Sequence, residues 1–143
     1  MIRHATPADA GLLHTLERAA FGSSAWSENQ ILGTLEHSGG FGLIVSDAEG
    51  AAAHLLGRAA AGEAELLRIG VKPDRRRRGL GGELLEAFHG ECECRNAPRR
   101  FLEVRADNTA AQGLYRAKSW SEAGRRPRYY RDGTDALIFT SRG

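Results

Sequence analysis

The sequence has 143 residues, of which 41% are hydrophobic and 27% charged, with 18 glycines and 4 prolines. This length and composition are typical of one globular domain, so we expect a single domain spanning residues 1–143. No apolar run approaches the roughly 18 residues of a membrane span, and residues 1–5 lack a signal peptide's apolar stretch. We therefore expect a cytoplasmic protein without a membrane partner. Twenty Lys and Arg against 18 Asp and Glu give a formal charge of +2, too small to indicate a polyanionic partner.

Cysteine and histidine show no metal-binding pattern. Cys92 and Cys94 lie two residues apart with no second cysteine pair, so we expect ordinary thiols in a reducing compartment. The five histidines are scattered through different predicted elements without metal-ligand spacing. We assign none of them a role and predict no metal site.

The first half of the chain predicts two helices and then an antiparallel meander. A short strand at residues 2–6 precedes a helix that Pro7 opens and that ends near Phe21. Ser27 and Gln30 have the spacing of a capping box, which starts a second short helix. From Gly39 onward the pattern favours strands, at residues 41–46, 51–58 and 65–71.

The second half predicts a crossover and a further strand–helix pair. Gly79 begins a helix that lasts to about Arg95, and Pro98 closes the connection to a strand at residues 101–106. A helix at 108–118 and strands at 120–125 and 136–140 follow. Strand runs mixed with crossovers favour an α+β or mixed-sheet domain over a doubly wound one.

A strand, a proline turn and a glycine-rich helix start follow one another between residues 69 and 82. The first turn of a helix has main-chain N–H groups without internal partners and about half a positive charge. Glycines there let a ligand approach the main chain closely, and arginines just before them add cationic donors. The pattern predicts an anion site suited to phosphate. It consists of Arg76, Arg77 and Arg78 followed by Gly79, Gly81 and Gly82.

Two common phosphate motifs do not fit this segment. The chain contains no Gly-Lys-Ser/Thr, which a nucleotide-hydrolysing phosphate loop requires. Gly79-Leu80-Gly81 is followed by Leu84 where a dinucleotide fingerprint needs glycine. A solvated basic turn before an amphipathic helix is the structural alternative.

This segment resembles the central motif of the GNAT acetyltransferase superfamily. Residues 76–81 read Arg-Arg-Arg-Gly-Leu-Gly and match Q/R-x-x-G-x-G/A, whose main chain binds the pyrophosphate of acetyl-CoA in that family. Residues 101–115 resemble the L-E-V-R-x-x-N-x-x-A-x-x-L-Y stretch of the RimI-type enzymes, bacterial N-terminal acetyltransferases that act on the alanine of a ribosomal protein. Residues 25–28 and 128–130 also resemble stretches of the RimI-type enzymes. The likeness spans nearly the whole chain.

The resemblance implies a fold and a cofactor site. The expected fold is a mostly antiparallel, twisted sheet with a central pair of splayed parallel strands and about four helices. Acetyl-CoA is the expected cosubstrate. Its contacts are expected from the splayed strand, the glycine turn and a helix N-cap: Ile69, Gly70 and Val71; Arg76, Arg77, Arg78, Gly79, Leu80, Gly81 and Gly82; and Asn108.

Two residues are candidates for catalysis. A terminal amine has a pKa near 8, so a group must accept its proton, and strand alternation places Glu103 on one face with Phe101 and Arg105. By resemblance Glu103 is the general base and Tyr115 the general acid. A solvent-facing Glu103 paired with Arg105, and a Tyr115 that only fills the core, are the alternatives.

By resemblance, the amine acceptor is expected to contact Trp26, Tyr129 and Tyr130. Aromatic side chains can stack on a peptide backbone and form hydrogen bonds with it. Packing roles for these aromatics are the alternative. One departure from the family is Ser119-Trp120 in place of Gly-Phe, which predicts local strain or a reshaped helix end.

The sequence therefore predicts an acetyl-CoA-dependent N-acetyltransferase acting on a protein or peptide N-terminus. A small-molecule amine or a lysine side chain is the alternative acceptor. A non-enzymatic acyl-CoA sensor is a weaker candidate, and nucleic-acid binding is disfavoured because the basic residues cluster in one loop. The sequence gives no indication of oligomeric state.

Overall fold

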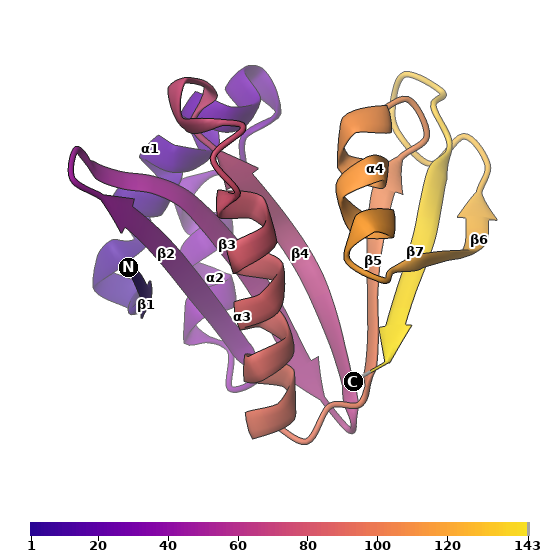
Figure 1. Cartoon of the computed structure of the whole chain (residues 1–143), viewed down its shortest axis with the longest axis horizontal. Coiled ribbons are helices and arrows are strands. Elements are labelled where there is room, and N and C mark those ends of the chain that lie inside the picture. The colour runs from indigo at the N-terminus through magenta and orange to yellow at the C-terminus, as the bar shows by residue number, and fades with distance from the viewer. Residues whose placement is uncertain (143) are drawn as a thin grey trace.

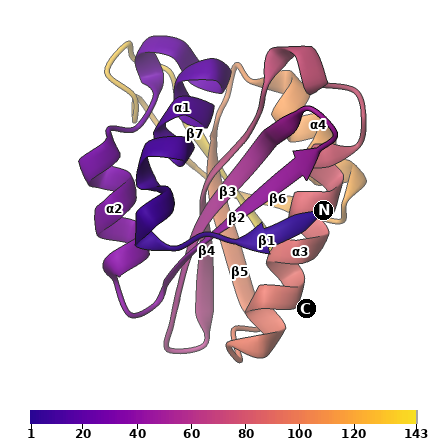
Figure 2. The ribbon, with the colours of Figure 1, turned by 90° about the vertical axis from the view of Figure 1, so that its left-hand side faces the viewer.

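Seven strands form one sheet in the order β1-β2-β3-β4-β5-β7-β6, with helices on both faces (Figures 1 and 2). This computed structural model describes residues 1–142. The helices are α1 (Ala10–Phe21), α2 (Glu28–Glu36), α3 (Leu80–Cys94) and α4 (Thr109–Ala117). The strands are β1 (Ile2–His4), β2 (Gly40–Asp47), β3 (Gly50–Ala60), β4 (Glu63–Val71), β5 (Arg99–Arg105), β6 (Ser121–Arg126) and β7 (Ala136–Arg142).

Helix starts agree with the sequence signals. The Ser27 side chain accepts a hydrogen bond from the Gln30 N–H, and the Gln30 side chain accepts one from the Ser27 N–H. The capping box is therefore confirmed. Pro7 opens a single 3₁₀ turn, Pro7–Asp9, before α1 begins. Strand β1 ends at His4, two residues earlier than expected. The last hydrogen bond from this segment to β2 is donated by the Ala5 N–H.

The two central strands separate after four residue pairs. β4 and β5 are parallel and pair from Glu63–Arg99 to Leu66–Leu102, while every other neighbouring pair is antiparallel. Beyond that point residues 67–71 of β4 have no partner strand on the β5 side. Figure 1 shows the two strands diverging toward the end that carries the start of α3. The expected splayed parallel pair is confirmed.

A β-bulge interrupts β4 at the same level. Leu56 pairs with Arg68 and Gly57 with Leu66, so Leu67 is an extra residue in the ladder. Leu66 packs in the cluster under α3, whereas Leu67 packs in the cluster under α1 and α2. The extra residue turns Arg68 toward α1 and returns Ile69 to the α3 side.

Each face of the sheet has its own apolar cluster. The smaller cluster joins α1 and α2 to β2 and β3 through Leu13, Leu16 and Ile31. The larger one, on the opposite face, contains a row of five aromatic rings with neighbouring centroids 6.0–6.3 Å apart. In order they are Phe41, Phe88, Trp120, Tyr115 and Phe139, from β2, α3, the turn before β6, α4 and β7. Among residues 1–142, no helix combines the length and the apolar character needed to traverse a bilayer.

Candidate active site

The glycine turn forms the N-terminus of α3. Gly79 is the N-cap with a φ of +80°, a left-handed conformation that favours glycine, and a Cβ there would meet open space. The first main-chain bond of the helix joins the Glu83 N–H to the Gly79 carbonyl. The N–H groups of residues 80–82 therefore have no intrahelical acceptor, as an anion site requires.

The neighbouring glycines have a packing reason as well. A Cβ on Gly81 would lie 3.0 Å from Leu114 Cδ2, and one on Gly82 would lie 3.0 Å from Lys118 Cε. A larger residue at either position would therefore require the Leu114 or Lys118 side chain to move. The sequence explained their size by ligand approach alone, and the structure adds this second reason.

The four consecutive arginines have different surroundings. Arg75, which the sequence did not single out, is buried and lies 3.4–3.6 Å from Asp47, Glu49 and Asp74. Arg78 points to the same β2–β3 hairpin acids at 3.8 and 3.9 Å.

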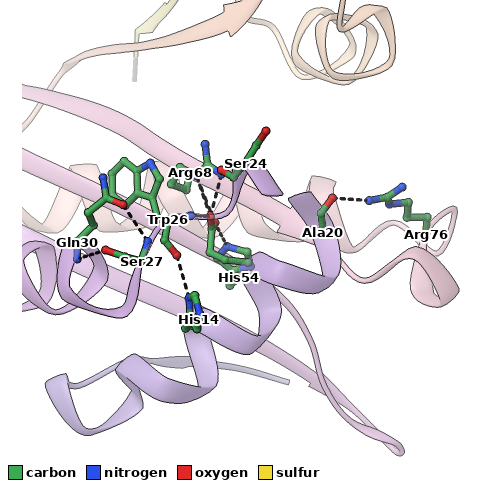
Figure 3. A network of polar contacts seen from close by, with 10 residues as sticks. His14, Ala20, Ser24, Trp26, Ser27, Gln30, His54, Arg68 and Arg76 are labelled. Atoms are coloured by element: carbon green, nitrogen blue, oxygen red, sulfur yellow. Dashed lines mark hydrogen bonds and ion pairs between the residues drawn. The ribbon is translucent and has the colours of Figure 1, made fainter. Parts of the chain in front are cut away.

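Arg76 donates to the main-chain carbonyls of Val71 and Ala20, and the second of these bonds is visible in Figure 3. Arg77 is exposed, has a φ of +66° and makes no ion pair or hydrogen bond with residues 1–142. Of the three arginines expected to bind an anion, only Arg77 has no other partner within that range.

The segment with Ile69, Gly70 and Val71 lies on the diverging part of β4. Ile69 and Val71 pack against the larger cluster. A Cβ on Gly70 would lie 2.8 Å from His54 Cε1 and 3.0 Å from Phe21 Cε2, so only glycine fits there without movement.

Glu103 faces away from the larger cluster, on β5, one residue beyond the last pair with β4. Leu102 and Val104 on either side of it are buried, as strand alternation predicts, and the Glu103 side chain is 20% exposed. Its Oε2 lies 2.6 Å from Arg126 Nε, a close ion pair without hydrogen-bond alignment. Oε1 makes no hydrogen bond within residues 1–142 and is not enclosed. The ion-pair partner is Arg126, whereas Arg105 pairs with Asp107 and Asp132.

Tyr115 is buried in α4 on the opposite face of the sheet from Glu103. Burial raises its pKa to about 12, while the positive charge of Arg68 acts in the opposite direction. Arg68 lies on the Glu103 side, on the part of β4 that has no pairing with β5. The hydroxyl makes no hydrogen bond within residues 1–142 and is not fully enclosed. Asn108 caps α4, its side chain accepting from the Ala111 N–H at 3.1 Å.

The expected acceptor aromatics lie at two separate places. Trp26 is half-buried at the start of α2, 5.4 Å from the Arg68 guanidinium, and it also lines a surface hollow of about 280 Å³ between α2 and β3. Tyr129 and Tyr130 stack edge to face in the β6–β7 connection, with Tyr130 under the Arg105 guanidinium at 4.8 Å. Burial raises the pKa of Tyr130, and the negative charge of Glu103 raises it further.

A comparison with known families agrees with this geometry. The model of the acetyltransferase (GNAT) family matches residues 5–119. The chain belongs to the GNAT family.

Known GNAT relatives are similar in sequence and in fold. The [ribosomal protein bS18]-alanine N-acetyltransferase of Salmonella typhimurium is 48% identical over 68 residues, which cover 48% of this chain and 46% of that protein. The chain thus spans about half the length of the curated relatives it matches. The crystal structure of the ribosomal-protein-S18-alanine N-acetyltransferase from Escherichia coli has a TM-score of 0.88 at 31% identity, covering 99% of this chain and 94% of that one. A GNAT acetyltransferase from Elizabethkingia anophelis, solved with acetyl-CoA bound, has a TM-score of 0.83 at 17% identity over 100% and 97%.

The residue that departs from the GNAT pattern after α4 has a left-handed backbone conformation. Ser119 has a φ of +70°, so the left-handed position is retained despite the side chain, and the expected effect is strain rather than reshaping. Trp120 is buried between Phe88 and Tyr115.

Sequence reasoning missed a buried polar cluster near Trp26. Glu17 contacts both His54 and Arg68 beneath the α1–α2 loop (Figure 3 labels His54 and Arg68). The signal was available, because each is an ionisable residue inside an apolar stretch of a different predicted element. Within residues 1–142, no set of three or more His, Cys, Asp or Glu side chains is arranged to hold a metal ion.

Proposed function

We propose that the protein transfers the acetyl group of acetyl-CoA to the N-terminal amine of a protein. The observation that carries this proposal is the end of β4–β5 pairing at Leu66 and Leu102. Beyond this point the main chain of β4 has no strand partner on the side of Glu103. Tyr115 lies on the other side of the sheet. The names of the relatives from Salmonella and Escherichia coli support an N-terminal alanine of a ribosomal protein as the acceptor.

The residues present fit acetyl-CoA, which supplies an activated acyl group when bound. The N–H groups of residues 80–82 and the free Arg77 guanidinium suit its pyrophosphate. The main chain of residues 67–71, including Ile69, Gly70 and Val71, can pair with an extended amide-containing arm, as an added strand would. We assign Arg76 and Arg78 to holding the turn in place through their contacts with β4, α1 and the β2–β3 hairpin.

Glu103 is the group we assign to proton removal from the acceptor. At pH 7 roughly nine tenths of an amine with a pKa near 8 is protonated and cannot attack a thioester. Oε1 of Glu103 is open and unbonded, so it can accept this proton directly or through water. Arg126 forms an ion pair with the other oxygen and leaves Oε1 free.

Tyr115 is assigned a hydrogen-bonding role toward the leaving sulfur. Its pKa of about 12 keeps the phenol protonated at neutral pH. Full transfer to a thiolate whose conjugate acid has a pKa of about 8.5 is unfavourable by more than three pKa units. A hydrogen bond to the developing thiolate stabilises the transition state without that transfer.

The acceptor approaches from the Glu103 face, between Trp26 on one side and Tyr129 and Tyr130 on the other. Tyr129 is 52% exposed, so its ring is available to a peptide. Asn108 stays assigned to the cofactor side through the resemblance, and its observed bond caps α4.

The test is acetyl transfer to a panel of acceptors, followed by intact mass. We expect a mass gain of one acetyl group on a peptide that begins with alanine and none on lysine peptides with blocked N-termini or on polyamines. Transfer only to lysine or polyamines would overturn the N-terminal assignment, and acetyl-CoA binding without any transfer would overturn the enzyme.

Variants test the two roles. Glu103→Gln and Tyr115→Phe should each lower kcat by about 10²–10⁴-fold at most. Glu122→Gln is the matched control, because Glu122 is also a strand glutamate paired with an arginine, Arg116, at 3.3 Å. An unchanged pH–rate profile in Glu103→Gln would refute the proton-removal role of Glu103, and an unchanged kcat in Tyr115→Phe would refute the hydrogen-bonding role of Tyr115.

A further inference from the structure

Three ionisable side chains that the proposed chemistry does not use meet beneath the α1–α2 loop. Glu17 comes from α1, His54 from β3 and Arg68 from β4. His54 and Arg68 are labelled in Figure 3. Glu17 and His54 are fully buried, and the Arg68 side chain is 20% exposed. Burying such groups is unfavourable unless they satisfy one another, so their presence needs a reason.

The Glu17 carboxylate is the centre of this cluster. Oε2 accepts from His54 Nε2 at 2.6 Å, and Oε1 accepts from Arg68 Nη2 at 2.8 Å. Oε1 also accepts from the Trp26 main-chain N–H at 2.9 Å. Burial raises the pKa of Glu17, but the bonds from His54, Arg68 and Trp26 outweigh it and lower the pKa to about 2. The carboxylate is therefore ionised and fully engaged.

The cluster holds the α1–α2 loop at several points. Besides the bond from Trp26 to Glu17, Arg68 Nη2 donates to the Ser24 carbonyl at 3.2 Å. The guanidinium carbon lies 4.2 Å from the centre of the Phe21 ring and 5.4 Å from that of Trp26. His14 Nδ1 meets the Trp26 carbonyl at 2.9 Å. The loop is thus held to Arg68 near its start and to Glu17, Arg68 and His14 at its end.

Arg68 also lies where the reaction is proposed to occur. It follows the bulge at Leu67, at the level where β4 leaves β5. Its charge acts on the pKa of both Tyr115 and Tyr130, which come from α4 and the β6–β7 connection. One guanidinium therefore connects the acceptor loop with the diverging strands.

Glycine at position 70 makes room for this arrangement. His54 Cε1 would be 2.8 Å from a Cβ there, so His54 and any larger residue at 70 exclude each other. His54 in turn donates to Glu17, because an ionised carboxylate can only accept.

We propose that Glu17, His54 and Arg68 are positioning residues that fix the α1–α2 loop, and with it Trp26, for binding of the acceptor amine. This inference rests on the proposed function. Arg68 is the member chosen for the test, because it alone contacts the Glu17 carboxylate, the Ser24 carbonyl and the aromatic rings of Phe21 and Trp26. The cluster acts on acceptor binding through the Arg68 side chain, whereas acetyl-CoA is proposed to pair with the main chain of residues 67–71, so acetyl-CoA binding should stay unchanged.

The kinetic test compares Arg68→Gln and Arg68→Lys with Arg99→Gln. Arg99 is an exposed β5 arginine, 3.7 Å from Glu63, at the far end of the sheet. Hydrogen bonds to a charged group are worth enough that KM for an alanine-initial peptide should rise about 10–100-fold in Arg68→Gln. The peptide KM of Arg68→Lys should lie between those of Arg68→Gln and the wild type, because lysine keeps the positive charge but cannot make the two parallel hydrogen bonds of a guanidinium. The dissociation constant of acetyl-CoA, measured by calorimetry, should stay within about twofold in all of them.

A second readout does not depend on activity. In a Trp120→Phe background Trp26 is the only tryptophan, so its fluorescence reports on the loop. We expect acrylamide to quench Trp26 more strongly in Arg68→Gln than in Arg99→Gln. If Arg68→Gln does not fold, the same comparison is made with Arg68→Lys.

Raised peptide KM together with raised quenching supports the inference. An unchanged KM, or a raised KM with unchanged quenching, overturns it. A wild-type protein that binds acetyl-CoA but acetylates no peptide overturns the proposed function, and the acceptor role of the cluster with it.

Discussion

Glu17 should make the stability of this protein depend on pH in a measurable way. Its pKa is lowered from 4.5 to about 2 in the folded state, where it accepts bonds from His54, Arg68 and Trp26. A depressed folded-state pKa stabilises the protein above the unfolded-state pKa, and the stabilisation is lost as pH falls from about 4.5 to 2. At 1.36 kcal/mol per pKa unit, this contribution is about 3 kcal/mol at pH 7, and about 2 kcal/mol of it is lost by pH 3.

The assay is urea denaturation of the wild type and of Glu17→Gln at several pH values between 7 and 3. Other carboxylates with lowered pKa values, such as Asp9 and Asp132, titrate in both proteins and cancel in the difference. The free-energy difference between the two proteins should therefore shrink by about 2 kcal/mol over this range. Glu36→Gln, at an exposed glutamate without an ion pair in the described chain, is the control for the loss of one carboxylate. If the difference for Glu17→Gln shrinks no more than the difference for Glu36→Gln, the depressed pKa is refuted.

Three further substitutions test backbone and packing features. Gly70→Ala places a Cβ 2.8 Å from His54 Cε1 and should lower the free energy of unfolding by about 1–3 kcal/mol in urea denaturation. Gly79→Ala meets no neighbour but must adopt a φ of +80°, so it should lower the unfolding free energy by about 1–2 kcal/mol through strain alone. A loss near zero would show that the turn relaxes. Asn108→Ala removes the side-chain bond to the Ala111 N–H and should lower Tm by an amount equivalent to about 1 kcal/mol, and an unchanged Tm would mean that water replaces the cap.

Local signals predicted the elements well. The Ser27 capping box, the Gly79 helix start and the Asn108 N-cap depend on residues within one turn of each other, so the sequence shows them directly. Alternation in β5 likewise placed Glu103 opposite Leu102 and Val104. The splayed strand pair came from the resemblance to the GNAT family, since no local pattern shows where two distant strands separate.

The remaining features depend on contacts between distant segments. Regular alternation from Leu66 would turn Arg68 toward α3, and only the bulge at Leu67 sends it to the Glu17 side. The pairing of Glu103 with Arg126 crosses from β5 to β6 over the intervening β7. Similarly, the four arginines at 75–78 look alike in sequence and take their separate roles from the β2–β3 hairpin and from α1.

The row of aromatic rings has a mechanical consequence for the sheet. In the sheet, only four residue pairs join the strand groups β1–β4 and β5–β7. The rings from Phe41 to Phe139 pass from one group to the other on a single face. Their packing therefore adds side-chain contacts across a border that main-chain pairing covers only in part.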